Sequence, residues 1–478
     1  VRRMLRYRGG ATVDQVARRY GWTVQEAGLV LEELLRREEA MAQEEPQRRE
    51  ESKEGKSPVP PEYMEIVYYH AQLYRRARIR TLKNRREEIA TCPPENYAAL
   101  LLSRIQRSAP PQETLQETIK SFAGMALPAP VWEELILPAR VRGYREGHLD
   151  TFLARGEYFW HMGEGGRIGF DAAEEIDWDR DVEVPWEELS DKEKRVAEAL
   201  SRRGASFPQA LSQVLEGESP HDTLLSLLEK GLVYADSFVP VRQWLNRDKL
   251  QKAAARQRVG ARVKVLQAGR FDLVRPLRPL TIQEQMERCF DRYLVLCRET
   301  AAAWGLNWQE ALKLLRVWEY TGQVRRGYFV RGLSGAQFLR RQDFESVTAR
   351  LMHPQEELCW LNAADPMQPW GKLLTHEPER SFINVPGTVV AFWNGLPAAV
   401  FERQGKALRL LGTEGRQGGE LQEGVLDKAL VLFAEEFRQG RIFPGKKRIS
   451  VKEYPSQASQ ALAASGFLHE IQDYVLYR

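Results

Sequence analysis

Apolar residues in the segment from residue 309 to residue 332 follow two different periods. The first half has apolar residues at helical spacing, namely Ala311, Leu314, Leu315 and Trp318. After a turn at Gly322, apolar and polar residues alternate from Val324 to Val330. The pattern predicts a helix followed by a β-hairpin, which suits a winged helix, although one copy alone favours a hairpin that caps a helical bundle.

The same order of helix, turn and alternating segment recurs three more times. LARGEYFWHMGEGGRIGF predicts strands at 157–161 and 167–170, EKGLVYADSFVPV predicts a hairpin at 232–241, and LLRREEAMAQ predicts a curtailed wing. Before that last copy, Thr23 and Glu26 have the spacing of a helix-capping box. Repetition of one supersecondary unit favours a series of winged helices over an isolated hairpin.

Two further stretches have other patterns. A long helix is expected over residues 63–89, where arginines and lysines are dense. Beyond residue 357, three strands are expected at 388–393, 396–402 and 407–411, with a tight turn at Asn394-Gly395. A helix at 423–437, a strand at 448–453, a helix ended by Gly466 and a last strand at 474–477 follow, which indicates a separate α+β unit.

The expected fold class is therefore α+β, with tandem winged-helix domains followed by a C-terminal module. The predicted boundaries are a winged helix at 1–45, a linker and basic helix at 46–95, a winged-helix-like domain at 96–180, a winged helix at 181–245, a basic linker at 246–279, a winged helix at 280–345 and the C-terminal module at 346–478.

Charge adds information because it is segregated along the chain, although the net charge of the 478 residues is only +4. Residues 171–193 hold eleven acidic and two basic residues, whereas residues 247–278 hold ten basic and two acidic ones. An acidic stretch repels phosphate, so the first predicts a linker or a surface for a basic protein. The second predicts binding to phosphate.

The cysteines, the apolar runs and the first residues indicate in which compartment the protein belongs. The four cysteines, Cys92, Cys289, Cys297 and Cys359, have neither metal-ligand spacing nor a disulfide pattern, which predicts free thiols in a reducing compartment. No apolar run approaches the ~18 residues of a membrane helix, and the start, VRRMLRYRGG, does not resemble a signal peptide. We expect a soluble cytoplasmic protein, and the start at Val1 suggests a piece of something longer.

Three long motifs, in order, carry a resemblance to a known family. They are LPAPVWEELILPARVRGYREGHLDTFLARGEYFW, RRGYFVRGLSGAQF and LNAADPMQPWGKLL. With them the chain resembles the carboxy-terminal half of the large helicase-related (Lhr-type) bacterial DNA repair helicases. The resemblance implies a run of winged helices followed by a β-barrel-like module, kinship with winged-helix DNA glycosylases, and a tendency to form homo-oligomers. It also implies nucleoid association and a possible helicase motor upstream, because this sequence has no Walker A motif and no DEAH-like box.

Candidate functional residues follow from charge and from the family resemblance. Predicted DNA contacts are Arg75, Arg76, Arg167, Lys249, Lys264, Arg325, Arg326 and Tyr328. Family members have been linked to removal of uracil from DNA, which makes Asp365 and Asp473 candidate catalytic carboxylates. Each aspartate also has a structural alternative, because either one can simply occupy a turn. Neither a metal nor another cofactor is expected.

Three functional hypotheses remain open from the sequence. The first is a DNA-binding region of an Lhr-type repair helicase that engages single-stranded or branched DNA. The second is a cofactor-independent, uracil-type DNA glycosylase. The third is an oligomerisation scaffold whose winged helices bind protein, which the acidic stretch favours.

Overall fold

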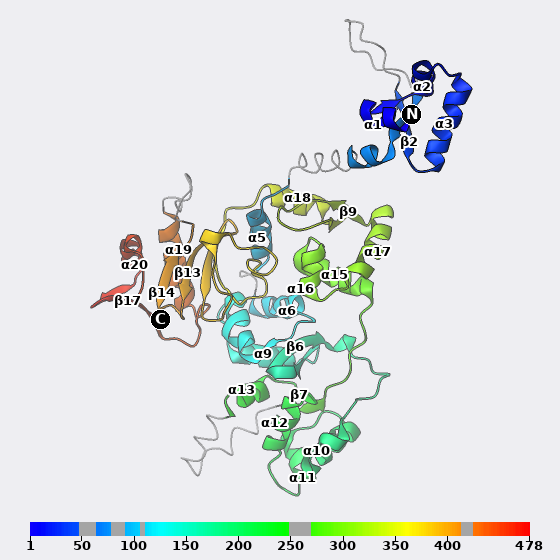
Figure 1. Ribbon diagram of the computed structural model, residues 1–478. Helices are drawn as coiled ribbons and strands as arrows, with labels where there is room; N and C mark the ends of the chain where they lie inside the picture. Colours follow the sequence, from blue (N-terminus) through cyan, green and yellow to red (C-terminus); the bar gives the residue numbers. More distant parts are fainter. Residues whose placement is uncertain (47–63, 78–90, 106–109, 248–268, 413–423) are drawn as a thin grey trace. The chain divides into compact units, whose positions relative to one another are not determined.

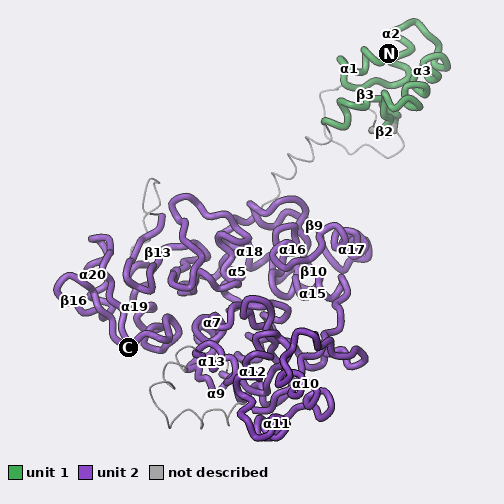
Figure 2. The backbone as a smooth tube through the Cα atoms, turned by 60° about the horizontal axis from the view of Figure 1, so that its bottom comes forward, with its two compact units in different colours: residues 1–90 green, residues 91–478 purple. Residues whose placement is uncertain are grey.

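The computed structural model describes residues 1–46, 64–77, 91–105, 110–247, 269–412 and 424–478. The chain forms two compact units, residues 1–90 and 91–478 (Figure 2). In the described residues no helix is both long and apolar enough to cross a membrane. All four cysteines are buried, and none forms a disulfide bond in the described residues.

The first unit is a winged helix with its own small core around Leu5, Val16 and Leu31. Its elements are α1 (Arg2–Arg8), β1 (Gly10–Ala11), α2 (Val13–Tyr20), α3 (Val24–Arg36), β2 (Ala40–Pro46) and β3 (Met64–His70). The expected capping box is present, since the Thr23 side chain accepts from the Glu26 backbone and the Glu26 side chain accepts from the Thr23 backbone.

The wing of this first unit is longer than the sequence predicts. Residues 64–70 form strand β3, where a helix is expected, and β3 pairs with both β1 and β2 in the order β1-β3-β2. The expected curtailed wing is therefore wrong, because MEIVYYH supplies the return strand. The β-branched and aromatic residues Ile66, Val67, Tyr68 and Tyr69 suit a strand better than a helix. The helix itself begins at Ala71 and includes Arg75 and Arg76, and residues 78–90 of the expected helix lie outside the described residues.

The second unit begins with a winged helix that matches its expected strands. Its sheet has the order β4-β6-β5, and Tyr158 of β5 pairs with Ala172 of β6. Its elements are α5 (Pro94–Leu102), α6 (Pro111–Ser121), β4 (Leu127–Pro128), α7 (Ala129–Val131), the π-helical turn η1 (Trp132–Ile136), α8 (Leu137–Arg140), α9 (Glu146–Leu153), β5 (Tyr158–Gly163) and β6 (Arg167–Ala172). Trp132 and Trp160 lie fully buried in its core, which continues into the next domain.

The next domain keeps its three expected helices but not its expected hairpin. Its elements are α10 (Asp191–Arg203), α11 (Pro208–Val214), α12 (His221–Glu229), β7 (Val233–Ala235), α13 (Val239–Leu245) and β8 (Phe271–Leu273). Residues 239–245 are helical, and the partner of β7 is β8, which lies in the stretch expected to be a basic linker. The pattern over residues 239–241 is too short to distinguish a strand from a helix, and Pro240 suits the first turn of a helix.

A further winged helix contains the segment in which the hydrophobic period changes (Figure 1). Asn307 caps its third helix by accepting from the backbone of Gln309 and Glu310, and the turn at Gly322 has a positive φ of 77°. Its elements are α15 (Ile282–Tyr293), α16 (Arg298–Trp304), α17 (Trp308–Tyr320), β9 (Val324–Gly327), β10 (Gln337–Arg340) and α18 (Phe344–Met352). The hairpin is confirmed, but its return strand is β10 rather than the residues directly after Gly327.

The C-terminal module contains open sheets. One sheet has the order β11-β12-β13-β14 and the other β15-β17-β16, joined in the described residues by a single bridge between Ala407 and Glu453. The expected strands at 388–411 and the Asn394-Gly395 turn are confirmed, with φ of 49° and 82° at the turn. Its elements are β11 (Leu358–Asn362), β12 (Val389–Trp393), β13 (Leu396–Glu402), β14 (Ala407–Leu410), α19 (Val425–Arg438), β15 (Arg448–Val451), α20 (Ser459–Ala464), β16 (Leu468–Glu470) and β17 (Asp473–Tyr477).

The α+β class is thus confirmed, while the barrel-like form of this module is corrected to two sheets that do not close within the described residues. The reason is that α19 covers one face of the four-stranded sheet. Its Phe433 packs on Trp360 and Phe401, so the sheet buries that face against a helix instead of against itself.

Candidate nucleic-acid interface

The wing formed by β9 and β10 presents one of its two predicted arginines to solvent. Val324 is buried and Arg326 is exposed, although positions two apart share one face of a strand, so the core ends between these two residues. Arg325 is half-buried, and its guanidinium carbon lies 4.2 Å from the ring centroid of Phe344. Arg326 is therefore free to reach a phosphate, whereas Arg325 would first have to leave its aromatic partner. Tyr328 follows the strand and is half-buried.

Gln337 fixes the tip of this wing, and sequence reasoning missed it. Its side chain is 1% exposed; Oε1 accepts from the backbone N–H groups of Phe329 and Val330 at 2.7 and 2.8 Å, and Nε2 donates to the Val330 carbonyl at 2.8 Å. The tip is also tied to Cys92, whose N–H donates to the Phe329 carbonyl at 2.9 Å. A lone glutamine in a sequence usually indicates a surface position, so only its place between two apolar residues in GAQF could have pointed to burial.

The other predicted contact residues are spread over the chain. Arg167 is exposed at the start of β6 and donates to the Ala126 carbonyl at 2.5 Å. Arg75 and Arg76 are exposed on the helix that follows β3, and Arg75 lies 3.8 Å from Glu38. Lys249 and Lys264 lie outside the described residues. These assignments stay predictions.

A larger basic feature lies inside the second unit, where sequence reasoning placed no site. It is a cavity of about 760 Å³, which we call the central cavity, lined by residues of α6, α8 and α15. Its charged lining residues are Arg104, Lys120, Arg140, Arg288, Arg292 and Arg350 together with Glu117, Glu175 and Asp291. Six cations stand against three anions in this lining, and the buried Asp365 pairs with Arg140, so the excess of two positive charges attracts anions.

Asp365, one of the two catalytic candidates, is held in a buried ion pair beside this cavity. Its carboxylate is 0% exposed, and Arg140, itself 4% exposed, donates to both oxygens at 2.7 and 2.9 Å. Burial alone raises the pKa of this carboxyl, but the Arg140 guanidinium outweighs burial and holds the pKa below its usual value. Oδ1 also accepts from the Met367 N–H at 2.9 Å, which is the turn-capping contact foreseen as the structural alternative.

This geometry favours a structural role for Asp365, because neither oxygen is exposed and both are engaged. Asp473 lies in β17, where it is half-buried and Oδ2 accepts from the Ser450 hydroxyl at 2.7 Å. The described contacts do not join Asp365 to Asp473 in one site. Both catalytic assignments stay predictions.

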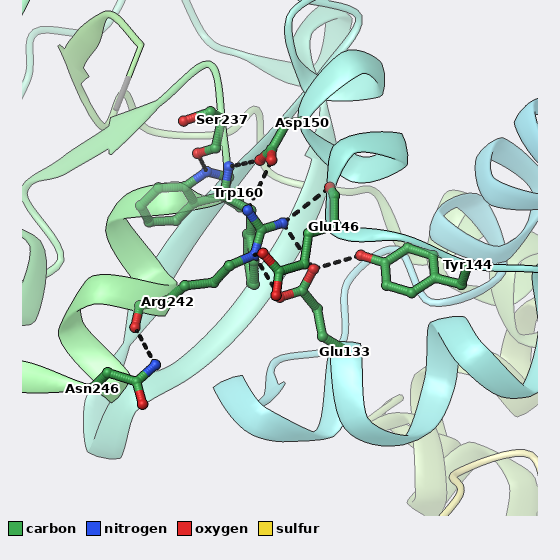
Figure 3. Close-up of polar contacts among 9 residues, drawn as sticks. Glu133, Tyr144, Glu146, Asp150, Trp160, Ser237, Arg242 and Asn246 are labelled. Atoms are coloured by element: carbon green, nitrogen blue, oxygen red, sulfur yellow. Dashed lines mark hydrogen bonds and ion pairs between the residues drawn. The ribbon is translucent and has the colours of Figure 1, made fainter. Parts of the chain in front are cut away.

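A second ion-pair network, also missed from sequence, joins two domains of this unit. Figure 3 shows Arg242 of α13 between Glu133 of η1 and Asp150 of α9. Its guanidinium donates to Glu133 at 2.7 and 2.8 Å and to Asp150 at 2.8 Å, and the Tyr144 hydroxyl donates to Glu133 at 2.5 Å. Burial alone lowers the pKa of Arg242, but the two carboxylates outweigh burial and raise it. The network fixes α13 on the domain before it.

Comparison with known proteins connects this architecture to one family. Residues 93–173 match the third, and residues 278–357 the fourth, winged-helix domain of the large helicase-related protein, Lhr. The chain is 28% identical over 376 residues to the Lhr helicase/uracil glycosylase of Escherichia coli, a match that covers 64% of this chain and 24% of that protein.

A second curated protein and one solved structure are also similar to the chain. The Lhr helicase/probable uracil glycosylase of Mycolicibacterium smegmatis is 28% identical over 391 residues, with 72% of this chain and 25% of that protein covered. The chain thus spans about a quarter of the length of these curated relatives. Among solved structures, the DNA glycosylase AlkZ of Streptomyces sahachiroi covers 77% of this chain and 99% of its own, with a TM-score of 0.38 and 13% identity. A likeness that distant carries no argument about function.

Proposed function

Because this chain is an Lhr-type carboxy-terminal region built of winged-helix domains, we propose that it binds DNA, in single-stranded or branched form. The observation that carries the proposal is the wing of residues 324–340, which exposes Arg326 on a strand pair whose tip Gln337 holds in place. An exposed arginine on a rigid wing suits a phosphate contact, because the energy of binding is not spent on ordering the loop. The other predicted arginines and lysines would add contacts of the same kind.

Fluorescence anisotropy with labelled single-stranded and forked DNA at several salt concentrations tests this proposal. Phosphate contacts make the logarithm of Kd depend steeply on the logarithm of salt concentration. Arg326→Ala is expected to weaken binding to all sequences alike and to reduce that slope by about 1. Arg195→Ala is the matched control, because Arg195 is exposed but its charge is already paired with Glu216 at 2.8 Å. Absence of binding at low salt would instead favour the oligomerisation scaffold.

A second candidate function is removal of uracil from DNA. The observation that favours it is that both curated relatives carry uracil glycosylase in their names. Incubation with uracil-containing single-stranded DNA followed by alkali detects the abasic product as strand cleavage. Asp473→Asn is the informative variant, because Asp473 is half-buried and is not part of a buried ion pair. Cleavage that persists in Asp473→Asn would remove this residue from the candidates.

The wider setting of the chain is proposed on the same family relation. A helicase motor in the same or another chain, homo-oligomer formation, and a place in the cytoplasm at the nucleoid all fit a DNA-binding region of this family. Size-exclusion chromatography with light scattering tests the oligomer directly, because the mass of one chain is 55.0 kDa.

A further inference from the structure

Arg292 is a buried cation with unused hydrogen-bond donors at the wall of the central cavity. It lies near the end of α15, is 4% exposed, and lines the cavity. Nη1 donates to the Ser121 carbonyl at 3.1 Å, but Nε and Nη2 have no hydrogen-bond partner among the described residues. A buried guanidinium without an anion is costly, since arginine stays charged and its donors have lost water.

In the described part of the chain no carboxylate forms an ion pair with Arg292, although its guanidinium interacts with the charge of Asp365 and with the Tyr293 side chain. Its guanidinium carbon lies 5.1 Å from the ring centroid of Phe122 and 5.7 Å from those of Tyr293 and Trp304. Arg140 lies at the same 5.1 Å from Phe122, but Arg140 is neutralised by Asp365. Aromatic rings offset part of the cost of burying a charge, yet they leave the N–H donors unused.

The other cations of the cavity also exceed its anions. Glu175 pairs with Arg288 within the lining, so these two charges cancel, and Asp291 pairs with Arg340 outside the cavity. Arg104 donates only to the Arg292 carbonyl, at 2.8 Å, and Arg350 only to the Ser103 hydroxyl, at 2.6 Å, among the described contacts. Both are therefore available to an anion that enters the cavity.

The size and one wall of the cavity suit a nucleotide. Its volume of about 760 Å³ lies within the usual range for sites that hold small molecules. Trp304 is half-buried and lines the same cavity, so its ring offers a surface on which a base can stack.

From these observations we propose that the central cavity binds a phosphate group of a DNA strand, with Arg292 as its buried donor and Arg104 and Arg350 beside it. This inference rests on the proposed DNA binding and gives it a specific site. Arginine suits the task because its planar fork can donate two parallel hydrogen bonds to phosphate oxygens. The phosphate can be a terminal phosphate at the end of a strand or a phosphodiester inside it. Only a site for the terminal phosphate requires a phosphorylated strand end.

The test measures ligand-dependent stability and DNA affinity on the full chain. Thymidine 5′-monophosphate and sodium pyrophosphate are expected to raise the thermal midpoint of the wild-type protein by several degrees. Arg292→Met keeps most of the side-chain volume and removes the charge, and it is expected to abolish that shift and to weaken binding of a short oligothymidylate about tenfold. Arg292→Lys is expected to restore only part of both, because lysine lacks the fork.

Further measurements distinguish a terminal from an internal phosphate, and a second variant covers the case in which Arg292→Met does not fold. A terminal site predicts that 5′- or 3′-phosphorylated oligothymidylate binds more tightly than the unphosphorylated strand, whereas an internal site predicts equal binding of all three. Arg350→Met removes an exposed cavity residue and is expected to weaken the same ligands even if Arg292→Met does not fold. Arg195→Met, outside the cavity, is the control.

The outcomes distinguish this inference from the proposed function. The cavity site would be overturned if Arg292→Met and Arg350→Met both keep the ligand-induced rise in thermal midpoint and the oligothymidylate affinity within twofold of wild type. The proposal that the chain binds DNA would still stand. Pyrophosphate shifts that depend on Arg292 in a protein that does not bind DNA at low salt would support a phosphate site but remove its assignment to DNA.

Discussion

Arg140 and Asp365 form a buried ion pair, so a substitution of either residue affects the other. The pair joins α8 to the loop after β11, across 225 positions in the sequence, and both side chains are almost wholly inaccessible. Bringing two charges out of water is costly, so the pair is useful to the fold mainly as a fixed connection between distant segments. Removal of one member leaves the other charged and buried, which costs more than the pair contributes.

We therefore predict that Asp365→Asn destabilises the second unit by about 3–5 kcal/mol, the usual cost of breaking a buried pair. Arg140→Met combined with Asp365→Leu is expected to recover much of that loss, because neither residue then carries a charge. Urea unfolding followed by circular dichroism measures both variants. A single mutant as stable as the wild type would show that the carboxylate is not needed for the fold and would revive its catalytic assignment.

The sequence alone predicted two possible roles for Asp365, catalysis or a turn, but not its ion pair with Arg140. The motif ADPMQPWG indicates a turn, and the turn is present, since Met367 donates to the Asp365 carboxylate. The partner, Arg140, could not be predicted because contacts between residues far apart in sequence leave no local pattern. Arg292 was missed for the same reason, as its burial depends on Phe122 and Trp304 from two different domains.

Among the elements, helices were predicted better than wings. Capping residues and helical spacing are local, so α3, α10 and α17 begin close to where the sequence indicates. A wing depends on a return strand that can lie anywhere further along the chain. For β2 that strand is β3 and for β7 it is β8, and both partners follow a long insertion that resembles a linker in composition.

Gln337 gives a prediction about the wing that carries Arg326. Gln337→Leu has a similar volume but leaves the N–H groups of Phe329 and Val330 without an acceptor, which costs about 1–3 kcal/mol per buried group. We expect faster hydrogen exchange over residues 324–340 than in the wild type, while exchange in α15 and α17 stays unchanged. Unchanged protection at the wing tip would show that the Cys92 contact alone holds it.

Glu193 gives a prediction about how α10 is held on α12. Burial alone raises its pKa, but hydrogen bonds from Lys230, Ser190 and Ser226 outweigh burial and lower the pKa to about 2. Because the folded pKa lies below the ordinary value of 4.5, these contacts stabilise the protein fully above pH 4.5. The stabilisation is lost as pH falls from 4.5 towards 2.

The measurement is the free energy of unfolding between pH 7 and pH 3 for the wild type and for Glu193→Gln. The variant is expected to be less stable at pH 7 by about 1–3 kcal/mol, since it loses charged hydrogen bonds, and this difference should shrink as the pH falls from 4.5 to 3. A difference that stays constant with pH would mean that the charge of Glu193 does not contribute.

At the scale of the whole molecule, the chain consists of two units whose cores are separate. Leu5, Val16, Leu31 and their neighbours form the core of residues 1–90, and the four other hydrophobic clusters lie wholly within residues 91–478. Since stability comes mainly from burial within a core, we expect each unit to fold on the apolar contacts among its own described residues. The wing, the buried ion pairs and the central cavity all belong to the second unit.

Residues 91–478 expressed alone are therefore expected to fold with a thermal midpoint within a few degrees of the main transition of the full chain, and residues 1–90 to unfold in a transition of their own. Differential scanning calorimetry of the two pieces and of the full chain measures this. The thymidine 5′-monophosphate shift should persist in residues 91–478, because every residue that lines the central cavity lies there. A shorter chain that fails to fold, or that loses the shift, would show that the first unit supports the second through contacts beyond the separate cores.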